Sequence, residues 1–391
     1  MSDEKSKPET IAVSAGRMSA EHFGTVNTPV YRTSTFLHPN LASLKAEIAD
    51  GKPKRFAYGR LGTPTTVSFE EAMSALEGAA RTVSLPSGLS AITTAILAVC
   101  KTGDHLLMAD NCYGPTRRFC GSMLKRIGVE TTFYDPLIGA GIEALFRPNT
   151  TAVYCESPGT LTFEVQDVPA IAAVAHAHGA LVLMDNTWAT PLCFPALSRG
   201  VDLSIQAGTK FIGGHSDVMI GTIAVREENA KRLVSFVNEL GLYASGDDCF
   251  LALRGLRTLP VRLRRHHETG LALTHWLADR PETSRILYPA LEGDPGHALW
   301  KRDFLGASGL FGVVLKPVGG DALAAMFDGL RHFGLGYSWG GYESLIIPAE
   351  FVRTARPFQA EGPVIRIHAG LEDAGDLIAD LEAGFKRMAA A

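Results

Sequence analysis

The chain has 391 residues, of which 46% are hydrophobic and 20% are charged, and its formal net charge is −4. This length predicts two or three domains, and the composition is that of an ordinary globular protein. The slight negative charge argues against a nucleic-acid or anionic-membrane partner, because such partners attract proteins with a basic excess.

Six cysteines occur without a Cys-x-x-Cys pair and without metal-ligand spacing, namely Cys100, Cys112, Cys120, Cys155, Cys193 and Cys249. Free cysteines in apolar segments behave as small hydrophobic residues, which fits a reducing compartment. The first ten residues lack the apolar core of a secretory signal, and no apolar run approaches the roughly 20 residues that span a bilayer. We therefore expect a cytoplasmic, soluble protein without a metal site.

The first 60 residues carry few periodic segments and several turn-forming residues, such as Pro29, Pro39 and Gly51. This pattern favours an extended arm that wraps a neighbouring subunit. The arm ends in F-A-Y-G-R at 56–60.

Helical periodicity starts at Thr65, and Gly78 is placed to end that helix. Ser87 is placed to cap a second helix over 89–100. From there strands and helices alternate. The expected strands are 82–85, 105–109, 131–134, 152–155, 181–184 and 201–205, and further helices are expected at 116–127 and from Asp167 to Gly179.

Nearly continuous apolar strands separated by helices indicate a mostly parallel α/β sheet that is covered on both faces. In such sheets the ligand lies off the carboxyl ends of the strands. Four polar segments fall at these ends, namely 110–113, 156–157, 185–186 and 208–210. One site is able to use all of them.

After about Leu259 the pattern changes to a smaller α+β domain. Its helices are expected at 268–278, 323–330 and 371–390, and its strands at 311–315 and 364–368. The expected organisation is an arm over 1–60, a large domain over 61–258 and a small domain over 259–391.

Lys210 lies among small and apolar residues in the segment V-D-L-S-I-Q-A-G-T-K-F-I-G-G-H over 201–215. Burying an ammonium is costly, whereas a lysine that forms a Schiff base loses its charge. Most lysines are surface residues, and Lys210 taken alone does not overturn the expectation of a surface lysine on a loop.

Pyridoxal phosphate (PLP) chemistry needs a lysine, a carboxylate for the pyridine nitrogen, a phosphate cradle and a group over the ring. Asp185 ends a strand and fits the carboxylate, although it also fits a turn cap. The start of the helix at Ser87 fits a phosphate cradle, although it also fits an ordinary cap. Arg366 on an apolar strand calls for a carboxylate partner, which an amino-acid substrate supplies.

These residues lie in stretches that resemble the Cys/Met-metabolism family of PLP enzymes, which have the aspartate-aminotransferase-like fold (fold type I). Within the family, the resemblance is greatest to the bacterial cystathionine β-lyase branch. It runs from about Tyr31 to the C-terminus. The resembling stretches are Y-G-R at 58–60, the turn at 110–113, E-S-P-G-T at 156–160, M-D-N-T-W at 184–188, S-I-Q-A-G-T-K at 204–210, G-H-S-D-V-M-I-G at 214–221, R-G-L-R-T-L at 254–259, Y-S-W-G-G-Y-E-S-L at 337–345 and R-I-H-A-G-L-E-D at 366–373.

The resemblance implies a role for each matching residue. Lys210 would carry PLP and move the Cα proton, and Asp185 would pair with the pyridine nitrogen. The residues implied to hold PLP are Lys210, Asp185, Ser87, Gly88, Leu89, Thr209, Tyr113 and, from a neighbouring subunit, Tyr58 and Arg60. The implied substrate-binding residues are Arg366, Ser338, Trp339 and Tyr113, and the implied catalytic residues are Lys210, Tyr113 and Tyr58.

The implied reaction is β-elimination of L-cystathionine to homocysteine, pyruvate and ammonia, as in methionine biosynthesis. The implied assembly is a homotetramer whose dimers share active sites. Ala207 and the segment after Ser157 favour the β-acting branch. Arg117 and Arg118 stand where cystathionine-using relatives can carry an acidic residue.

Four alternatives stay open at this stage. They are a γ-acting relative (cystathionine γ-lyase, γ-synthase or methionine γ-lyase), a lyase for cystine or cysteine S-conjugates, an amino-acid racemase, and a non-enzymatic regulator on the same fold.

Overall fold

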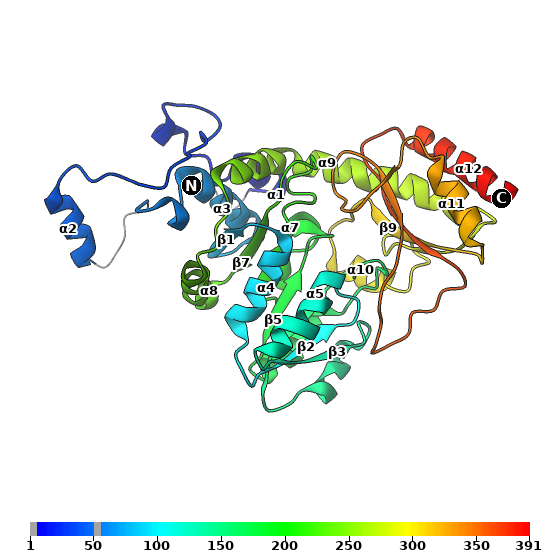
Figure 1. The fold of residues 1–391 in the computed structure, drawn as a ribbon, viewed down its shortest axis with the longest axis horizontal. Coiled ribbons are helices and arrows are strands. Elements are labelled where there is room, and N and C mark those ends of the chain that lie inside the picture. The colour runs from blue at the N-terminus through cyan, green and yellow to red at the C-terminus, as the bar shows by residue number, and fades with distance from the viewer. Residues whose placement is uncertain (1–5, 51–55) are drawn as a thin grey trace.

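A computed structural model describes residues 6–50 and 56–391. Two sheets, each covered by helices, are joined by one long helix, α9 (Gly246–Ala278), which runs along the top of the molecule in Figure 1. The predicted α/β class, with a mostly parallel main sheet, is confirmed. No helix within the described residues is long and apolar enough to cross a membrane.

The larger sheet has the strand order β1-β7-β6-β5-β4-β2-β3. All neighbouring strands are parallel except β7, which is antiparallel to both β1 and β6. The strands are β1 (Arg81–Leu85), β2 (His105–Ala109), β3 (Glu130–Tyr134), β4 (Thr150–Glu156), β5 (Leu181–Asp185), β6 (Leu203–Gln206) and β7 (Gly221–Val225).

Both faces of this sheet are buried, so successive residues of a strand face different apolar layers. Leu107 and Val182 belong to the layer that includes α6 and α9, whereas Leu106 and Leu183 belong to the layer that includes α4. The helices around the sheet are α3 (Pro64–Glu77), α4 (Gly88–Val99), α5 (Gly114–Phe119), α6 (Val168–Ala177), α7 (Thr190–Cys193) and α8 (Glu227–Leu240).

The predicted helix ends are confirmed where a capping residue marks them. Ser87 accepts a hydrogen bond from the backbone N–H of Ser90, and Gly78 ends α3 in the left-handed conformation, with φ +65°. The helix that we expected over 116–127 differs, because α5 begins at Gly114 and continues as a π-helical turn over Cys120–Leu124.

The second sheet has the order β10-β11-β12-β9-β8 and is mostly antiparallel. Its strands are β8 (Thr283–Leu287), β9 (Leu310–Leu315), β10 (Gly334–Leu335), β11 (Leu345–Pro348) and β12 (Val364–His368), and its helices are α10 (His297–Asp303), α11 (Gly320–Asp328) and α12 (Ala374–Ala390). The helix that we expected over 268–278 is only the end of α9. The expected boundary at 258/259 therefore lies inside a continuous helix.

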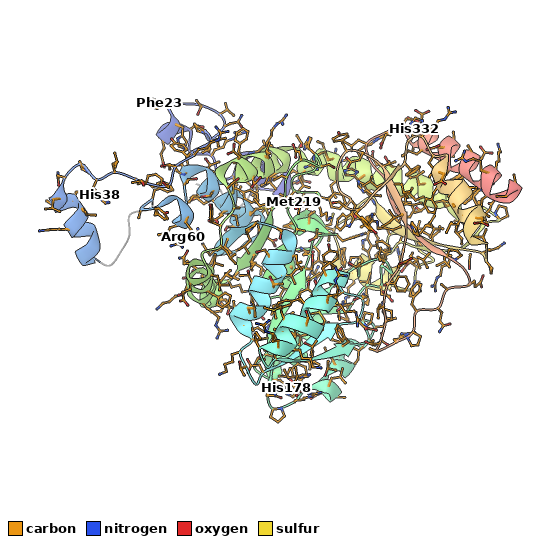
Figure 2. All side chains as sticks on the ribbon, in the orientation of Figure 1. Phe23, His38, Arg60, His178, Met219 and His332 are labelled. Carbon is orange, nitrogen blue, oxygen red and sulfur yellow. The ribbon has the colours of Figure 1, made fainter. Side chains whose placement is uncertain are left out.

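The N-terminal segment contains α1 (Pro8–Ser14), which packs against α3 and α9, and α2 (Leu41–Asp50), which lies far from both sheets (Figure 1). Between these helices the chain exposes large apolar side chains, including Phe23 and Leu37. Figure 2 shows Phe23 and His38 at one end of the molecule and Met219, from the loop that carries Lys210, near its middle. An arm that exposes such residues buries little of its apolar surface within its own chain.

Candidate active site

Lys210 lies in the loop between β6 and β7, at the carboxyl end of β6. Backbone hydrogen bonds from Thr209 N to Ile220 O (3.1 Å) and from Gly214 N to Lys210 O (2.8 Å) close the loop on itself. Gly214 has φ +70°, a conformation that favours glycine. The loop is therefore ordered by its own backbone before any ligand is considered.

Helix α9 packs closely against this loop. A Cβ atom at Gly255 would lie 2.1 Å from the carbonyl oxygen of Gly213, so only glycine permits this approach. The buried guanidinium of Arg262 donates hydrogen bonds to Phe211 O (2.8 Å) and Gly255 O (2.7 Å). We did not single out Arg262 from the sequence, where it stands in a basic segment without any sign of its partner.

The Lys210 ammonium is mostly buried and donates a hydrogen bond to Ser338 Oγ at 2.7 Å. It lies 5.2 Å from the ring centroid of Trp339. Burial and the nearby positive charge of Arg366 lower its pKa to about 8, and the negative charge of Asp185 opposes this shift. A pKa of about 8 leaves roughly a tenth of Lys210 unprotonated at pH 7, far more than its usual pKa would allow.

Asp185 ends β5, and its Cα partner in the parallel register is Glu156 at the end of β4. Asp185 Oδ1 accepts a hydrogen bond from the backbone N–H of Thr187 at 2.9 Å. Burial raises the pKa of Asp185, while the bond to Thr187 and the charge of Lys210 lower it. Within the described residues Asp185 forms no ion pair, so its carboxylate is available to a cationic group.

Glu156 begins the stretch E-S-P-G-T at 156–160, but the sequence alone indicates no role for it. It is buried, accepts a hydrogen bond from the backbone N–H of Tyr113 at 2.8 Å, and is bonded by the hydroxyl of Thr160. Burial and the charge of Asp185 raise its pKa to about 8. Glu156 therefore stays protonated at neutral pH and fixes the backbone at Tyr113.

Tyr113 directly precedes α5, at the end of the turn after β2, and it is 43% exposed. Burial of part of the ring and the charge of Glu156 raise the pKa of its phenol. Arg366, Asp185 and Arg118 also act on this phenol, so the ring lies within electrostatic reach of the Lys210 surroundings.

The N-terminus of α4 lies beside the same loop. A Cβ atom at Gly88 would lie 2.4 Å from the side chain of Ala207, so glycine allows the helix to approach β6. The backbone N–H groups of Gly88 and Leu89 are in the first turn of the helix, where no intrahelical acceptor exists. Thr209 follows Ala207 by two residues, and its Oγ1 accepts a hydrogen bond from the backbone N–H of Ile220 at 3.0 Å.

Arg366 enters from β12 of the second sheet and is buried. Its Nη2 donates a hydrogen bond to Ser338 O at 2.8 Å, and its Nε has no hydrogen-bond partner within the described residues. Burial lowers its pKa to about 10. A buried guanidinium with an unused donor is suited to bind a carboxylate.

Ser338 itself is unusual in its backbone, because it has φ +76° without being glycine. Its hydroxyl bonds Lys210 and its carbonyl bonds Arg366, so this one residue contacts both cations. Gly340 is pressed against the backbone of Lys210 and Phe211, which holds the segment over the loop.

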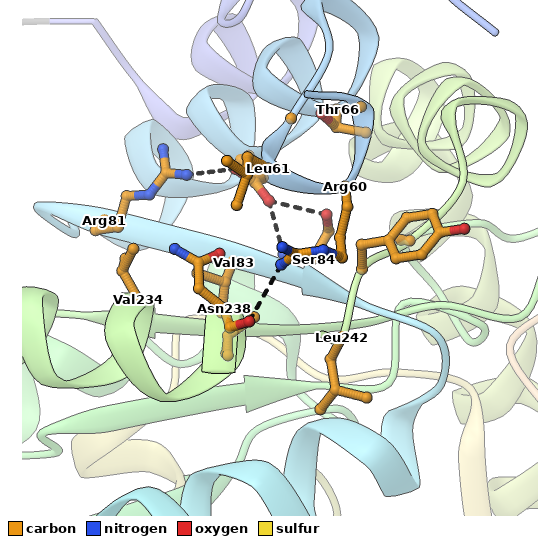
Figure 3. Close-up of a pocket in the computed structure, with 15 residues that line it drawn as sticks. Arg60, Leu61, Thr66, Arg81, Val83, Ser84, Val234, Asn238 and Leu242 are labelled. Carbon is orange, nitrogen blue, oxygen red and sulfur yellow. Dashed lines mark hydrogen bonds and ion pairs between the residues drawn. The ribbon is translucent and has the colours of Figure 1, made fainter. Parts of the chain in front are cut away.

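Tyr58 and Arg60 lie elsewhere. Arg60 donates a hydrogen bond to Asn238 O at the end of α8 (3.1 Å) and lines a hollow with Arg81 and Ser84 (Figure 3). Tyr58 is about half exposed and borders an adjoining cleft of about 450 Å³ that Tyr31 and Asp247 also line.

The structure thus brings together the predicted residues of the sheet edge, of the Lys210 loop and of the second sheet. By contrast, Tyr58 pairs with Thr35 of the same arm, and Arg60 contacts α8. Within the described residues there is also no cluster of three or more metal-ligating side chains.

The pattern of the family described as "Cys/Met metabolism PLP-dependent enzyme" matches residues 9–386. The chain is 44% identical to cystathionine beta-lyase MetC of Escherichia coli (strain K12) over 98% of this chain and 99% of that protein. It is 40% identical to the L-alanine/L-glutamate racemase of Wolbachia pipientis wMel, with 98% of each covered.

Among solved structures, the chain is similar to cystathionine gamma synthase from Xanthomonas oryzae pv. oryzae, in complex with aminoacrylate and cysteine. The TM-score is 0.90 at 32% identity, with 98% of this chain and 99% of that chain covered.

Proposed function

The chain belongs to the Cys/Met metabolism PLP-dependent enzymes, and we propose that it is a carbon–sulfur lyase of the cystathionine β-lyase type. It cleaves L-cystathionine by β-elimination to homocysteine, pyruvate and ammonia. The observation that carries the proposal is the partly buried Lys210 ammonium, which is hydrogen-bonded to Ser338, feels the charges of Arg366 and Asp185, and has a pKa lowered to about 8. The similarity to a β-lyase over nearly the whole of both chains supports the choice of substrate.

The residues present fit PLP. Gly88 lies so close to Ala207 that a Cβ atom would intrude, and this contact places the start of α4 against the loop that carries Thr209. Asp185 and Arg366 Nε have no ion-pair or hydrogen-bond partner, respectively, within the described residues, so a cofactor and its substrate find free groups there. We propose that Ser87, the N–H groups of Gly88 and Leu89, and Thr209 hold the phosphate, because a helix N-terminus attracts anions. Asp185, which has no ion-pair partner in the described chain, would hold the protonated pyridine nitrogen, and Tyr113 would supply the aromatic group for the ring.

When bound, PLP supplies an electron sink for the pair that is left when Cα loses its proton. Lys210, as a neutral amine, removes that proton, and its lowered pKa makes the amine available near neutral pH. Arg366 binds the α-carboxylate, and Ser338 and Trp339 orient Lys210 beside it. This arrangement holds the Cα–H bond near the base while the Cβ–S bond breaks.

We further propose that the protein is a cytoplasmic homotetramer in which dimers share active sites. Tyr58 and Arg60 contact the arm and α8 in their own chain, and Tyr58 is about half exposed. The arm exposes apolar side chains that a second copy would cover. On this proposal Tyr58 and Arg60 hold the phosphate in the neighbouring subunit, and Tyr58 takes part in its reaction.

Two other reactions use the same residues. A γ-acting enzyme is suggested by the similarity to the γ-synthase structure, and racemisation by the similarity to the racemase. Both begin with removal of the Cα proton, so the Lys210 geometry alone does not separate them from β-elimination. The products that the enzyme releases distinguish these reactions from β-elimination.

The test is product analysis with L-cystathionine and PLP. We expect pyruvate and homocysteine in equal amounts. Cysteine with 2-oxobutyrate instead would contradict the proposal and indicate a γ-lyase. Interconversion of L- and D-alanine without pyruvate from cystathionine would indicate a racemase.

A further inference from the structure

Two consecutive arginines in the last turn of α5, Arg117 and Arg118, have different surroundings. Arg117 is turned into the protein, where its Nη2 donates hydrogen bonds to both the side chain and the carbonyl oxygen of Asp110. Its guanidinium also lies 3.8 Å from the ring centroid of Phe133. Arg117 is thus neutralised by a buried carboxylate and has little capacity for a ligand.

Further contacts exclude Asp110 as a partner for any other cation. Asp110 Oδ2 accepts the backbone N–H groups of Thr354 and Ala355, both at 2.8 Å, and Arg353 lies within 3.4 Å of it. The carboxylate is fully buried under these groups. No part of it reaches the neighbouring Arg118.

Arg118 is exposed, and within the described chain its guanidinium forms no ion pair. Its side chain folds back toward the start of the helix, since a Cβ atom at Gly114 would lie 3.8 Å from its Nη1. Gly114 directly follows Tyr113. The charge of Arg118 therefore reaches the Tyr113 phenol, whose pKa it lowers against the effect of burial.

Tyr113 connects this arginine to the rest of the site. The same phenol also feels the charge of Arg366, the group that we assign to the α-carboxylate of the substrate. The site consequently has a second guanidinium beside Tyr113, separate from the first and without a carboxylate of its own. Arginine binds carboxylates with a planar pair of donors.

We propose that Arg118 binds a carboxylate at the far end of the substrate's sulfur substituent, and that the chain prefers S-substituted cysteines that end in a carboxylate. The inference rests on the proposed function and narrows its substrate class. An ammonium at the same end is repelled by Arg118. A distal amino-acid group, as in cystathionine, combines attraction with repulsion and gains less than a carboxylate alone.

The substrates for the test differ only at that end. They are S-(2-carboxyethyl)-L-cysteine, L-cystathionine, S-ethyl-L-cysteine and S-(2-aminoethyl)-L-cysteine. In each case the Cβ–S bond breaks, the sulfur leaves as a thiol with one proton, and water converts the remaining fragment to pyruvate and ammonium. Released pyruvate therefore reports all four reactions equally.

The holoenzyme and the variants Arg118→Ala, Arg118→Asp and Arg126→Ala are compared. Arg126 is a second exposed arginine of the same helical region and serves as the matched control. We expect Arg118→Ala to lower kcat/KM for the carboxyethyl substrate about tenfold, which corresponds to about 1.4 kcal/mol. S-ethyl-L-cysteine should be unaffected, and Arg118→Asp should favour the aminoethyl substrate.

A binding measurement separates recognition from turnover. With Lys210→Ala as the background, calorimetry gives Kd for the carboxyethyl and ethyl substrates with and without Arg118→Ala. We expect the difference between the two Kd values to disappear when Arg118 is removed. The difference should also decrease at high ionic strength, because Arg118 is exposed.

An equal change for all substrates in Arg118→Ala, or the same selective change in Arg126→Ala, would overturn the inference and leave the proposed function standing. If the unaltered enzyme releases no pyruvate from any of the four, the proposed function is wrong. In that case equal Kd values for the carboxyethyl and ethyl substrates would overturn the role of Arg118 as well.

Discussion

Two groups of buried charge lie at the same edge of the larger sheet, and they differ in how their charges are compensated. The first, the paired cluster, consists of Asp110, Glu164, Arg117 and Arg353. The second, the open cluster, consists of the charged groups Asp185, Lys210 and Arg366, with the protonated carboxyl of Glu156 beside Asp185.

In the paired cluster each acid contacts an arginine. Arg353 reaches Glu164 at 3.0 Å and Asp110 at 3.4 Å, and hydrogen bonds hold the pKa of Asp110 below its usual value despite burial. In the open cluster the pKa of Lys210 is lowered and that of Glu156 is raised, each first because of burial. The compensated charges of the paired cluster hold the structure together, whereas the uncompensated charges of the open cluster are available to bind a ligand.

The paired cluster also joins the two sheets. Arg353 and Thr354 belong to the segment between β11 and β12, whereas Asp110 follows β2 and Glu164 follows β4. Because β12 carries Arg366, this cluster fixes the proposed substrate-binding arginine relative to the Lys210 loop. The stability of one cluster thus supports the function of the other.

The largest effect is expected from Lys210→Ala, which removes the central group of the open cluster. Loss of the base should lower β-elimination by at least about 10³-fold. The fold should persist, since burying this ammonium without a carboxylate contact is costly in the absence of ligand. Pyruvate release measures the rate of β-elimination, and thermal unfolding measures whether the fold persists. Retention of normal turnover would contradict the assignment of Lys210.

A large effect on stability, by contrast, is expected from Arg353→Ala. Removing this buried cation takes an ion-pair partner from the buried carboxylate of Asp110 and from the partly buried carboxylate of Glu164, and we expect the free energy of unfolding to fall by about 3–5 kcal/mol. Arg356→Ala is the matched control in the same segment, because Arg356 is 53% exposed and pairs with Asp135. It should cost less than about 1 kcal/mol in urea denaturation. Equal losses in both variants would remove the distinction between paired and surface charge.

The smallest effect concerns pH. If neutral Lys210 is the base, log kcat should rise with pH below about 8 and level off above it, because the protonated amine is inactive. Glu156 titrates in the same range, so the profile is repeated with Glu156→Gln. The rise should remain in that variant. Its disappearance would assign the titration to Glu156.

Much of the open cluster follows from the sequence, because each of its segments ends a strand with a clear apolar pattern. Asp185 and Lys210 are predicted in this way, and Ser87 by its position before an apolar helix. The paired cluster could not be predicted. Asp110 and Thr354 are separated by 244 positions, and the segment around Arg353 has no periodicity.

The length of α9 also escaped prediction, because Pro260 normally ends a helix. The helix continues through Pro260, with Leu256, Leu259 and Leu263 buried on its packed face. Whether Tyr58 and Arg60 reach a second copy stays a prediction, since one chain contains no partner.

The most direct test of the central claim, that the open cluster holds PLP through Lys210, is chemical mapping of the cofactor. The holoprotein is reduced with borohydride and digested, and mass spectrometry locates the pyridoxyl group. We expect it on the peptide that contains Lys210, and we expect none in Lys210→Ala. A pyridoxyl group on any other lysine, with Lys210 unmodified, would contradict the account.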